Sequence, residues 1–246
     1  MKSMLFENRR SKSVSFIAKS RKLINLMTNH LFDMGYYREA ESARLMNLFA
    51  HIDLEQWQGM SVLEVGAGVG NIGKVFINMG FDVTSTDGRP EYVEKMKSEG
   101  RKAFVLDLDN TSIDEVGQFD IILSFGVLYH LSNPEKHLLG CHNAKILVLE
   151  SLVCDTSEPV VIPIREKKGW RGKDQALNEL GCRPSPSWIE QKIREAGFSI
   201  IRDISNPNAN WVKGKFDWVP KNSNLWKVGD INYRKMWVCE KVKLDR

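Results

Sequence analysis

The stretch Val62-Leu63-Glu64-Val65-Gly66-Ala67-Gly68-Val69-Gly70 decides the fold. Its apolar first half predicts a buried strand, and its glycines allow the backbone to turn sharply and to approach a ligand closely. A helical pattern follows over residues 71–79, and the first turn of a helix offers N–H groups that have no partner within the helix. The stretch therefore predicts a strand, a tight turn and a helix, with a ligand bound at the turn.

Strand–helix units repeat outward from this stretch and continue to about residue 150. Such alternation predicts a parallel sheet with helices on both faces, and in such sheets a ligand lies beyond the carboxyl ends of the strands. The strands are predicted over residues 61–65, 81–86, 103–106, 119–124 and 145–149, and the helices over residues 71–79, 91–99 and 134–141.

Other patterns flank this core. Residues 13–51 predict two helices that Gly35 separates, so we expect residues 1–58 to form an N-terminal helical extension. The main domain is expected over residues 59–246, with a late helix over 187–196 and two late strands over 198–204 and 235–242. Residues 151–184, with few regular elements expected, and residues 205–234 are predicted to be excursions on the acceptor side.

The predicted fold class is thus α/β. We expect a Rossmann-like, mostly parallel seven-stranded sheet with helices on both faces, an antiparallel C-terminal edge hairpin and the N-terminal helical extension.

Composition indicates an ordinary soluble protein of 246 residues, with 42% hydrophobic residues, 27% charged residues and a net charge of +4. The apolar stretch over residues 119–131 is too short and too polar to cross a bilayer, and we find no signal peptide. The four cysteines form no metal-binding pair, and their low number is typical of a reducing compartment. We therefore expect a cytoplasmic protein with no metal site and no membrane partner, whose oligomeric state the sequence does not indicate.

Two cofactors fit the glycine-rich turn. Spaced as Gly68-x-Gly70-x-x-Gly73, the glycines match a dinucleotide fingerprint. Spaced as Glu64-x-Gly66-x-Gly68-x-Gly70, the stretch resembles the first motif of the class I S-adenosylmethionine-dependent methyltransferases. A carboxylate before the first glycine disfavours a pyrophosphate but suits a cofactor with a cationic amino acid and a sulfonium. The acidic residue therefore favours S-adenosylmethionine.

Later motifs strengthen this resemblance. Asp87 follows the second predicted strand, where a carboxylate can accept hydrogen bonds from both ribose hydroxyls, although it could instead only start a turn. In the resembled family, the position of Asp107 contacts the adenine amino group; Asp109 competes for that role. The fourth strand continues into Phe125-Gly126-Val127-Leu128-Tyr129-His130-Leu131, which is similar to the fourth methyltransferase motif. The resemblance implies ten cofactor-binding residues: Glu64, Gly66, Ala67, Gly68, Gly70, Asp87, Gly88, Asp107, Leu108 and Phe125.

Methyl transfer from a sulfonium is an in-line displacement, so the protein must align the acceptor and exclude water. A general base is needed only when the acceptor loses a proton, as a hydroxyl does. His130 is the natural candidate because it lies just past the fourth strand, although it could be a structural histidine. Tyr129 could line the same pocket, and Glu150, at the end of the fifth strand, could orient the acceptor or act as base.

The acceptor is the least determined part of the prediction. Three tryptophans in the polar segment before the last strand could stack on a sugar ring or enclose an amine, and basic residues of the earlier excursion suit phosphate or carboxylate groups. Pieces of the C-terminal third are similar to bacterial methyltransferases associated with surface-glycan synthesis. These pieces are residues 183–188, 216–218 and 233–237. The three tryptophans are Trp211, Trp218 and Trp226, and the basic residues are Arg165, Lys167, Lys168, Arg171 and Lys173.

We therefore expect methyl transfer to an oxygen or nitrogen of a small molecule: a sugar, a sugar phosphate or another anionic metabolite. The Tyr129-His130 pair resembles tRNA-modifying members of the superfamily, which makes a nucleic-acid acceptor the alternative. A NAD-dependent oxidoreductase or epimerase is the second alternative, and a subunit that keeps the fold without activity is disfavoured by the intact glycines, Glu64 and Asp87.

Overall fold

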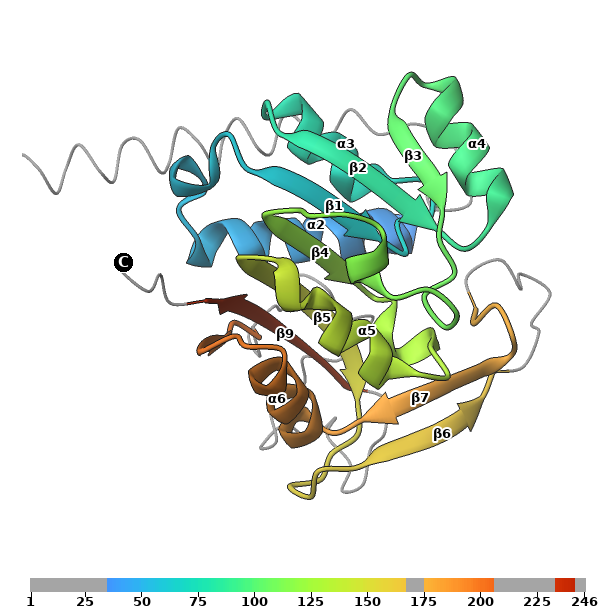
Figure 1. Ribbon diagram of the computed structural model, residues 1–246, viewed down its shortest axis with the longest axis vertical. Coiled ribbons are helices and arrows are strands. Elements are labelled where there is room, and N and C mark those ends of the chain that lie inside the picture. Colours follow the sequence, from blue (N-terminus) through green and yellow to red (C-terminus); the bar gives the residue numbers. More distant parts are fainter. Residues whose placement is uncertain (1–34, 167–174, 206–232, 242–246) are drawn as a thin grey trace, which may run out of the picture.

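The computed structural model describes residues 35–166, 175–205 and 233–241 (Figure 1). The first predicted N-terminal helix lies outside the described residues. So do Trp211, Trp218 and Trp226 and, in the earlier excursion, Lys167, Lys168, Arg171 and Lys173.

A seven-stranded sheet forms the centre of the molecule, in the order β3-β2-β1-β4-β5-β9-β8. Six strands run in the same direction, whereas β9 runs antiparallel between β5 and β8. This order confirms the predicted sheet and its antiparallel hairpin, and it differs from the 3-2-1-4-5-6 order of dinucleotide-binding domains. The strands are β1 Ser61–Val65, β2 Asp82–Asp87, β3 Lys102–Val105, β4 Ile121–Phe125, β5 Ile146–Val153, β8 Ile200–Asp203 and β9 Tyr233–Glu240.

Helices cover both faces of the sheet, as predicted. In Figure 1, α2 runs along one face, with α3 near it, and α5 and α6 lie on the other. The α-helices are α2 Gly35–His51, α3 Asn71–Asn78, α4 Pro90–Ser98, α5 Pro134–Gly140 and α6 Pro186–Glu195. Short 3-10 helices are η2 Leu54–Trp57, η3 Ile113–Glu115, η4 Leu128–His130 and η5 Cys141–Asn143.

The strands β5 and β9 show how the sequence divides between the two faces. Along each strand, alternate apolar residues enter different core clusters, because successive side chains of a strand point to opposite faces. Val148 and Val238 face α2 and α3, whereas Leu149 and Trp237 face α5 and α6, and all four are completely buried. A strand buried on both faces reads as a continuous apolar run, and this is why the sequence predicted β5.

The first excursion is more regular than the sequence predicted. Its strands β6 Val161–Arg165 and β7 Leu180–Pro184 form a two-stranded antiparallel ribbon, and β7 packs against η4. Pro163 is tolerated because a two-stranded ribbon leaves each strand with one free edge. The expectation of few regular elements was therefore wrong, because a proline and charged residues concealed a short edge strand.

None of the helices within residues 35–166, 175–205 and 233–241 is long and apolar enough to span a membrane.

Candidate active site

The glycine-rich turn joins β1 to α3 as the sequence predicted. Gly66, Gly68 and Gly70 all have positive φ angles, of 59°, 57° and 71°. Glycine is required at position 66 for a second reason, because an added Cβ would lie 2.4 Å from a methyl group of Val127. The turn can therefore bring the loop after β4 against the end of β1, and this places both motifs on one cavity.

Glu64 stabilises this turn through hydrogen bonds to the elements next to it. One of its carboxylate oxygens accepts from Gly73 N–H at 3.0 Å and the other accepts from the Ser85 hydroxyl at 2.7 Å. Burial raises the pKa of Glu64 to about 7. The residue lines the cavity, but both oxygens are bonded to α3 and β2, so its main observed role is to join three elements under the turn.

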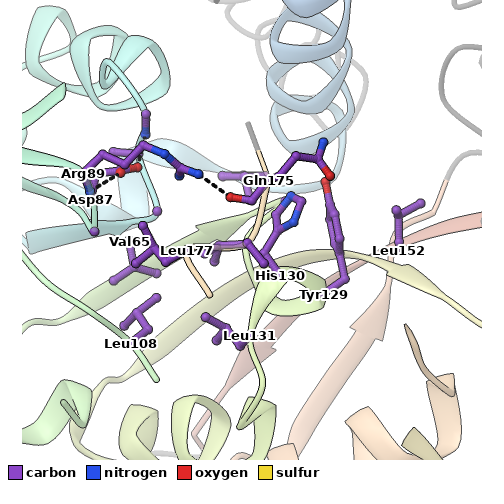
Figure 2. A pocket seen from close by; sticks show the side chains of 18 of the residues that line it. Val65, Asp87, Arg89, Leu108, Tyr129, His130, Leu131, Leu152, Gln175 and Leu177 are labelled. Carbon is purple, nitrogen blue, oxygen red and sulfur yellow. Dashed lines mark hydrogen bonds between the residues drawn. The ribbon is translucent and has the colours of Figure 1, made fainter. Parts of the chain in front are cut away.

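Asp87 holds the turn from the neighbouring strand. Its carboxylate accepts from Gly68 N–H at 2.8 Å and from Arg89 N–H at 2.9 Å. The side chain is buried on the wall of the cavity, and burial raises its pKa. The ends of β1 and β2 are thus fixed to each other by one carboxylate that also faces the ligand space (Figure 2).

One cavity of about 580 Å³ lies at the carboxyl ends of the strands. Ten of the thirteen residues predicted for cofactor binding or catalysis line it, and Figure 2 shows Asp87 on one side and Tyr129 and His130 on the other. The ten are Glu64, Gly66, Ala67, Gly68, Asp87, Gly88, Leu108, Phe125, Tyr129 and His130.

Three predicted residues lie outside the cavity wall. The carbonyl of Gly70 accepts from Arg101 at 2.6 Å on the far side of the turn. The carboxylate of Asp107 closes its own loop through Asp109 N–H and the Asn110 amide, while Asp109 lines the cavity. The third residue, Glu150, lies behind the wall.

Glu150 is completely buried between two arginines. One of its oxygens accepts from Arg44 at 2.9 Å and the other accepts from Arg234 at 2.7 Å. Burial alone would raise the pKa of Glu150, but the charges of Arg234 and Arg44 hold it below its usual range. Its carboxylate therefore positions two cations that line the cavity, rather than facing an acceptor itself.

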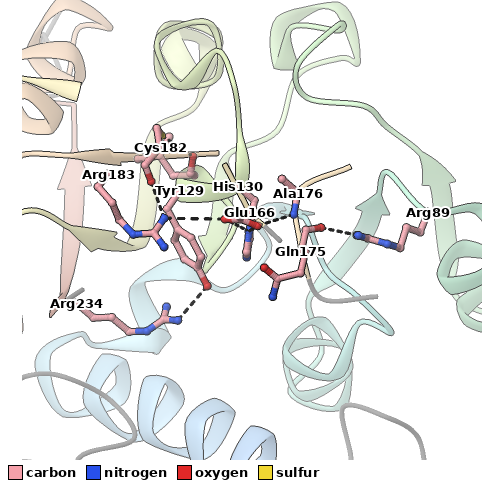
Figure 3. Close-up of polar contacts among 10 residues, drawn as sticks. Arg89, Tyr129, His130, Glu166, Gln175, Ala176, Cys182, Arg183 and Arg234 are labelled. Atoms are coloured by element: carbon pink, nitrogen blue, oxygen red, sulfur yellow. Dashed lines mark hydrogen bonds and ion pairs between the residues drawn. The ribbon is translucent and has the colours of Figure 1, made fainter. Parts of the chain in front are cut away.

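Tyr129 lies among these cations. Arg234 donates to its hydroxyl at 2.9 Å, and the guanidinium carbons of Arg234 and Arg183 lie 5.0 and 5.3 Å from the ring centroid. Both distances are typical of cation–π contacts. This end of the cavity is thus an aromatic ring held by positive charge (Figure 3).

His130 is paired with a carboxylate that the sequence did not indicate. Its Nδ1 lies 2.8 and 2.9 Å from the two oxygens of Glu166, the residue that follows β6. Ala176 N–H donates to the same carboxylate at 2.7 Å. The ribbon therefore reaches over the fourth motif and fixes its histidine.

Sequence reasoning missed most of the cavity wall around Tyr129 and His130. Only a partial signal existed: α2 carries the charged residues Glu41 and Arg44 on its buried face, which is unusual for a helix that only packs. The missed residues that line the cavity are Tyr37, Glu41, Arg44, Arg89, Glu166, Gln175, Leu177, Arg183 and Arg234. Within the described residues, no three His, Cys, Asp or Glu side chains are grouped so as to hold a metal ion.

Known proteins match this architecture. A family model described as "Methyltransferase domain" matches residues 63–145. The tRNA U34 carboxymethyltransferase of Shewanella sp. (strain ANA-3) is 28% identical over 178 residues, which are 68% of this chain and 52% of that protein. Its counterpart from Haemophilus influenzae (strain PittGG) is 28% identical over 182 residues, 68% of this chain and 54% of that protein. The chain spans about half the length of these curated relatives.

Solved structures give the same fold. The N-terminal domain of EvdMO1 with S-adenosylhomocysteine (SAH) bound superposes with a TM-score of 0.62 at 16% identity, covering 92% of this chain and 95% of that one. Magnesium protoporphyrin IX methyltransferase from Synechocystis PCC 6803 with bound SAH gives 0.53 at 12% identity, covering 98% and 100%.

Sheet order, glycine turn and family match together define the class I S-adenosylmethionine-dependent methyltransferases. The methyltransferase-domain model matches residues 63–145, and this match confirms the class that the motifs predicted. The looser resemblance to enzymes of surface-glycan synthesis stays a prediction.

Proposed function

We propose that the cavity binds S-adenosylmethionine and that the protein transfers the methyl group of this cofactor to an acceptor at the Tyr129–His130 end. One observation carries the proposal: a single cavity of about 580 Å³ joins the glycine turn and Asp87 to His130. That volume is in the range of small-molecule sites. The cofactor-binding residues of the class motif that line it are proposed to hold the nucleoside and the amino acid of the cofactor.

We propose a uridine of a tRNA as the acceptor. The name of the matched relatives, tRNA U34 carboxymethyltransferase, supports a nucleic acid over a sugar. The acceptor end suits such a ligand, since Arg183 and Arg234 next to Tyr129 offer charge for phosphates and a ring on which a base can stack. Because the chain spans about half the length of those relatives, their name and the contacts of the site together support the acceptor only as a proposal.

The same name raises a second candidate, transfer of a carboxymethyl group. Such a donor carries an additional carboxylate beside the transferred carbon, and a cation must meet it. Arg234 lines the cavity, is bonded to Glu150 and Tyr129, and is the candidate for that contact.

Calorimetric titration of the protein with SAH and, in parallel, with NAD tests the cofactor. We expect saturable SAH binding and no NAD heat; NAD binding alone would contradict the proposal.

Transfer is then measured with tritiated S-adenosylmethionine and with carboxy-S-adenosylmethionine, on total tRNA and on nucleotide sugars. Label on tRNA supports the main proposal. Label on nucleotide sugars alone would contradict the tRNA proposal and favour the sugar acceptor that the sequence predicted. Carboxymethylated tRNA would support the second candidate.

A further inference from the structure

The pair formed by His130 and Glu166 is more constrained than a surface ion pair. Glu166 is 7% exposed, its two oxygens lie 2.8 and 2.9 Å from His130 Nδ1, and Ala176 N–H fixes the carboxylate at 2.7 Å (Figure 3). Gly181 lies directly against it, because a Cβ there would be 2.8 Å from a Glu166 oxygen and 2.5 Å from the carbonyl oxygen of Tyr129. The ribbon thus approaches η4 as closely as glycine permits.

This geometry determines which imidazole nitrogen carries the proton. Burial would raise the pKa of Glu166, but the hydrogen bond and charge of His130, with the Ala176 N–H, hold it below its usual range. An ionised carboxylate only accepts hydrogen bonds, so Nδ1 must carry the proton. Neutral His130 then has its lone pair on Nε2, which has no hydrogen-bond partner among the described residues, and Figure 2 shows the ring standing in the cavity.

We infer that Glu166 is a positioning residue that holds His130 as a general base, so that the acceptor atom is a hydroxyl oxygen. The inference rests on the proposed function and narrows it. A base that offers a lone pair to the cavity is of use to an acceptor that must lose a proton as it attacks, which a hydroxyl does and a neutral amine does not.

The step balances as follows. The acceptor oxygen attacks the methyl carbon of the sulfonium while its proton passes to Nε2 of His130, and the C–S bond breaks with its electron pair on sulfur. The products are the methyl ether, neutral SAH and an imidazolium that the Glu166 carboxylate stabilises. The proton leaves to solvent before the next turnover.

Among the described residues, three other polar groups lie around the pair of His130 and Glu166. Arg183 of β7 is 3.9 Å from Glu166, Tyr129 is adjacent with its ring centroid 4.1 Å away, and the Asp109 carboxylate accepts from the N–H groups of Ser132 and Asn133. Glu166 is the carboxylate in direct contact, so its removal is the change that tests the pair.

The first test reads the tautomer directly and needs no acceptor. Two-bond nitrogen–proton correlation spectra of 15N-histidine-labelled protein with SAH, assigned through His130→Asn, should show a proton on Nδ1 and none on Nε2. In Glu166→Gln, we expect the proton to move to Nε2 in a measurable fraction; Glu158→Gln, an exposed residue before β6, is the matched control. A proton on Nε2 in the wild type, or an unchanged spectrum in Glu166→Gln, overturns the inference.

The second test uses transfer to whichever acceptor the labelled panel identifies. Glu166→Gln should lower kcat about 10–1,000-fold with the KM for the donor within about twofold, and the double variant with His130→Gln should be no slower than His130→Gln alone. Glu166→Asp should recover part of the rate. Additive losses, loss of SAH binding, or an acceptor that is methylated on nitrogen would overturn the inference.

The two failures are distinguishable. If the wild type binds no SAH or transfers no label, the proposed function fails; if it transfers label but the tautomer does not depend on Glu166, only the inference fails.

Discussion

The two ends of the cavity are built in different ways. At the glycine turn, Glu64 and Asp87 bond mainly to backbone N–H groups of the adjoining turn and helix, and the partners are close in sequence. At the Tyr129–His130 end, which we propose as the acceptor end, side chains bond to side chains across large distances in sequence: Arg44 with Glu150, Arg234 with Glu150, and His130 with Glu166. The first end depends on chain geometry, the second on charge pairs brought together by the completed fold.

This difference has an energetic consequence. A carboxylate that accepts from backbone N–H groups keeps its partners when neighbouring side chains change. A buried ion pair loses its compensation when one member is removed, because the other charge stays buried. The acceptor end should therefore be the more sensitive to single substitutions, and the following experiments examine that contrast.

The largest effect is expected for Glu150→Gln. This change removes the buried carboxylate that Arg44 and Arg234 share, and it should lower the free energy of unfolding by about 3–5 kcal/mol. Urea unfolding of the ligand-free protein measures it, with Glu158→Gln as an exposed control. A loss below about 1 kcal/mol would show that the arginines separate into solvent.

At the cofactor end, Asp87→Ala should weaken SAH binding by about 2–4 kcal/mol, since charged hydrogen bonds are lost. Calorimetric titration measures the change. Asp107→Ala serves as the comparison, because that carboxylate lies outside the cavity, and should change affinity less than about tenfold. A larger loss in Asp107→Ala would move the adenine contact there.

Two buried residues, Glu64 of β1 and His137 of α5, should make the free energy of unfolding depend on pH in opposite directions, by about 3 kcal/mol each. Burial raises the pKa of Glu64 from 4.5 to about 7, so its contribution to stability is present below pH 4.5 and lost as the pH rises to about 7. Burial lowers the pKa of His137 from 6.5 to about 4, so its contribution is present above pH 6.5 and lost as the pH falls toward 4.

The pH ranges over which Glu64 and His137 change the free energy of unfolding overlap. Replacing one of the two residues should therefore leave only the pH dependence that the other residue causes. The stability of Glu64→Gln should increase relative to that of the wild type as the pH rises from 4.5 to 7. The stability of His137→Gln should increase relative to that of the wild type as the pH falls from 6.5 to 4. Urea unfolding at constant ionic strength measures both. Parallel curves for wild type and variant would contradict the assignment of the slope to that residue.

The smallest expected effect is that of Gly181→Ala. The added methyl group overpacks the contact of β7 with Tyr129 and Glu166 and should cost about 1–3 kcal/mol in the free energy of unfolding. Affinity for SAH should stay within about threefold, since the ribbon faces the acceptor end. Gly35→Ala, with nothing within 4 Å of an added Cβ, is the control. Equal losses in the two variants would contradict a tight ribbon.

The sequence predicted the central sheet because short apolar runs alternate with amphipathic stretches, as buried strands alternate with helices in the structure. Strands such as β1 and β4 are buried on both faces and read as apolar runs, and the glycines after β1 mark a turn that few other residues can adopt. Ten cavity residues could be predicted because the sequence motifs lie at or shortly after the carboxyl ends of the first four strands.

The acceptor end could not be predicted in the same way. Glu166 lies in a charged segment where nothing distinguishes it from its neighbours, and only the pairing of β6 with β7 brings it to His130. Glu150 was predicted as a base because the expected fifth strand, over residues 145–149, ended just before it. In the structure β5 continues to Val153, so Glu150 lies within the strand and behind the cavity wall. Its two arginines come from α2 and β9, and no local pattern indicates such partners.

The position of β9 has a consequence for how the protein is made. This strand pairs with β5 and β8 inside the sheet, yet among the strands that the structure describes it is the last to be synthesised. Until it arrives, β5 presents an unpaired edge and Glu150 lacks Arg234, to which it is joined across 84 positions of sequence. The glycine turn after β1 can form before β9 is synthesised, whereas the pair of Glu150 and Arg234 can form only afterwards, so the two ends of the cavity are completed at different stages of synthesis.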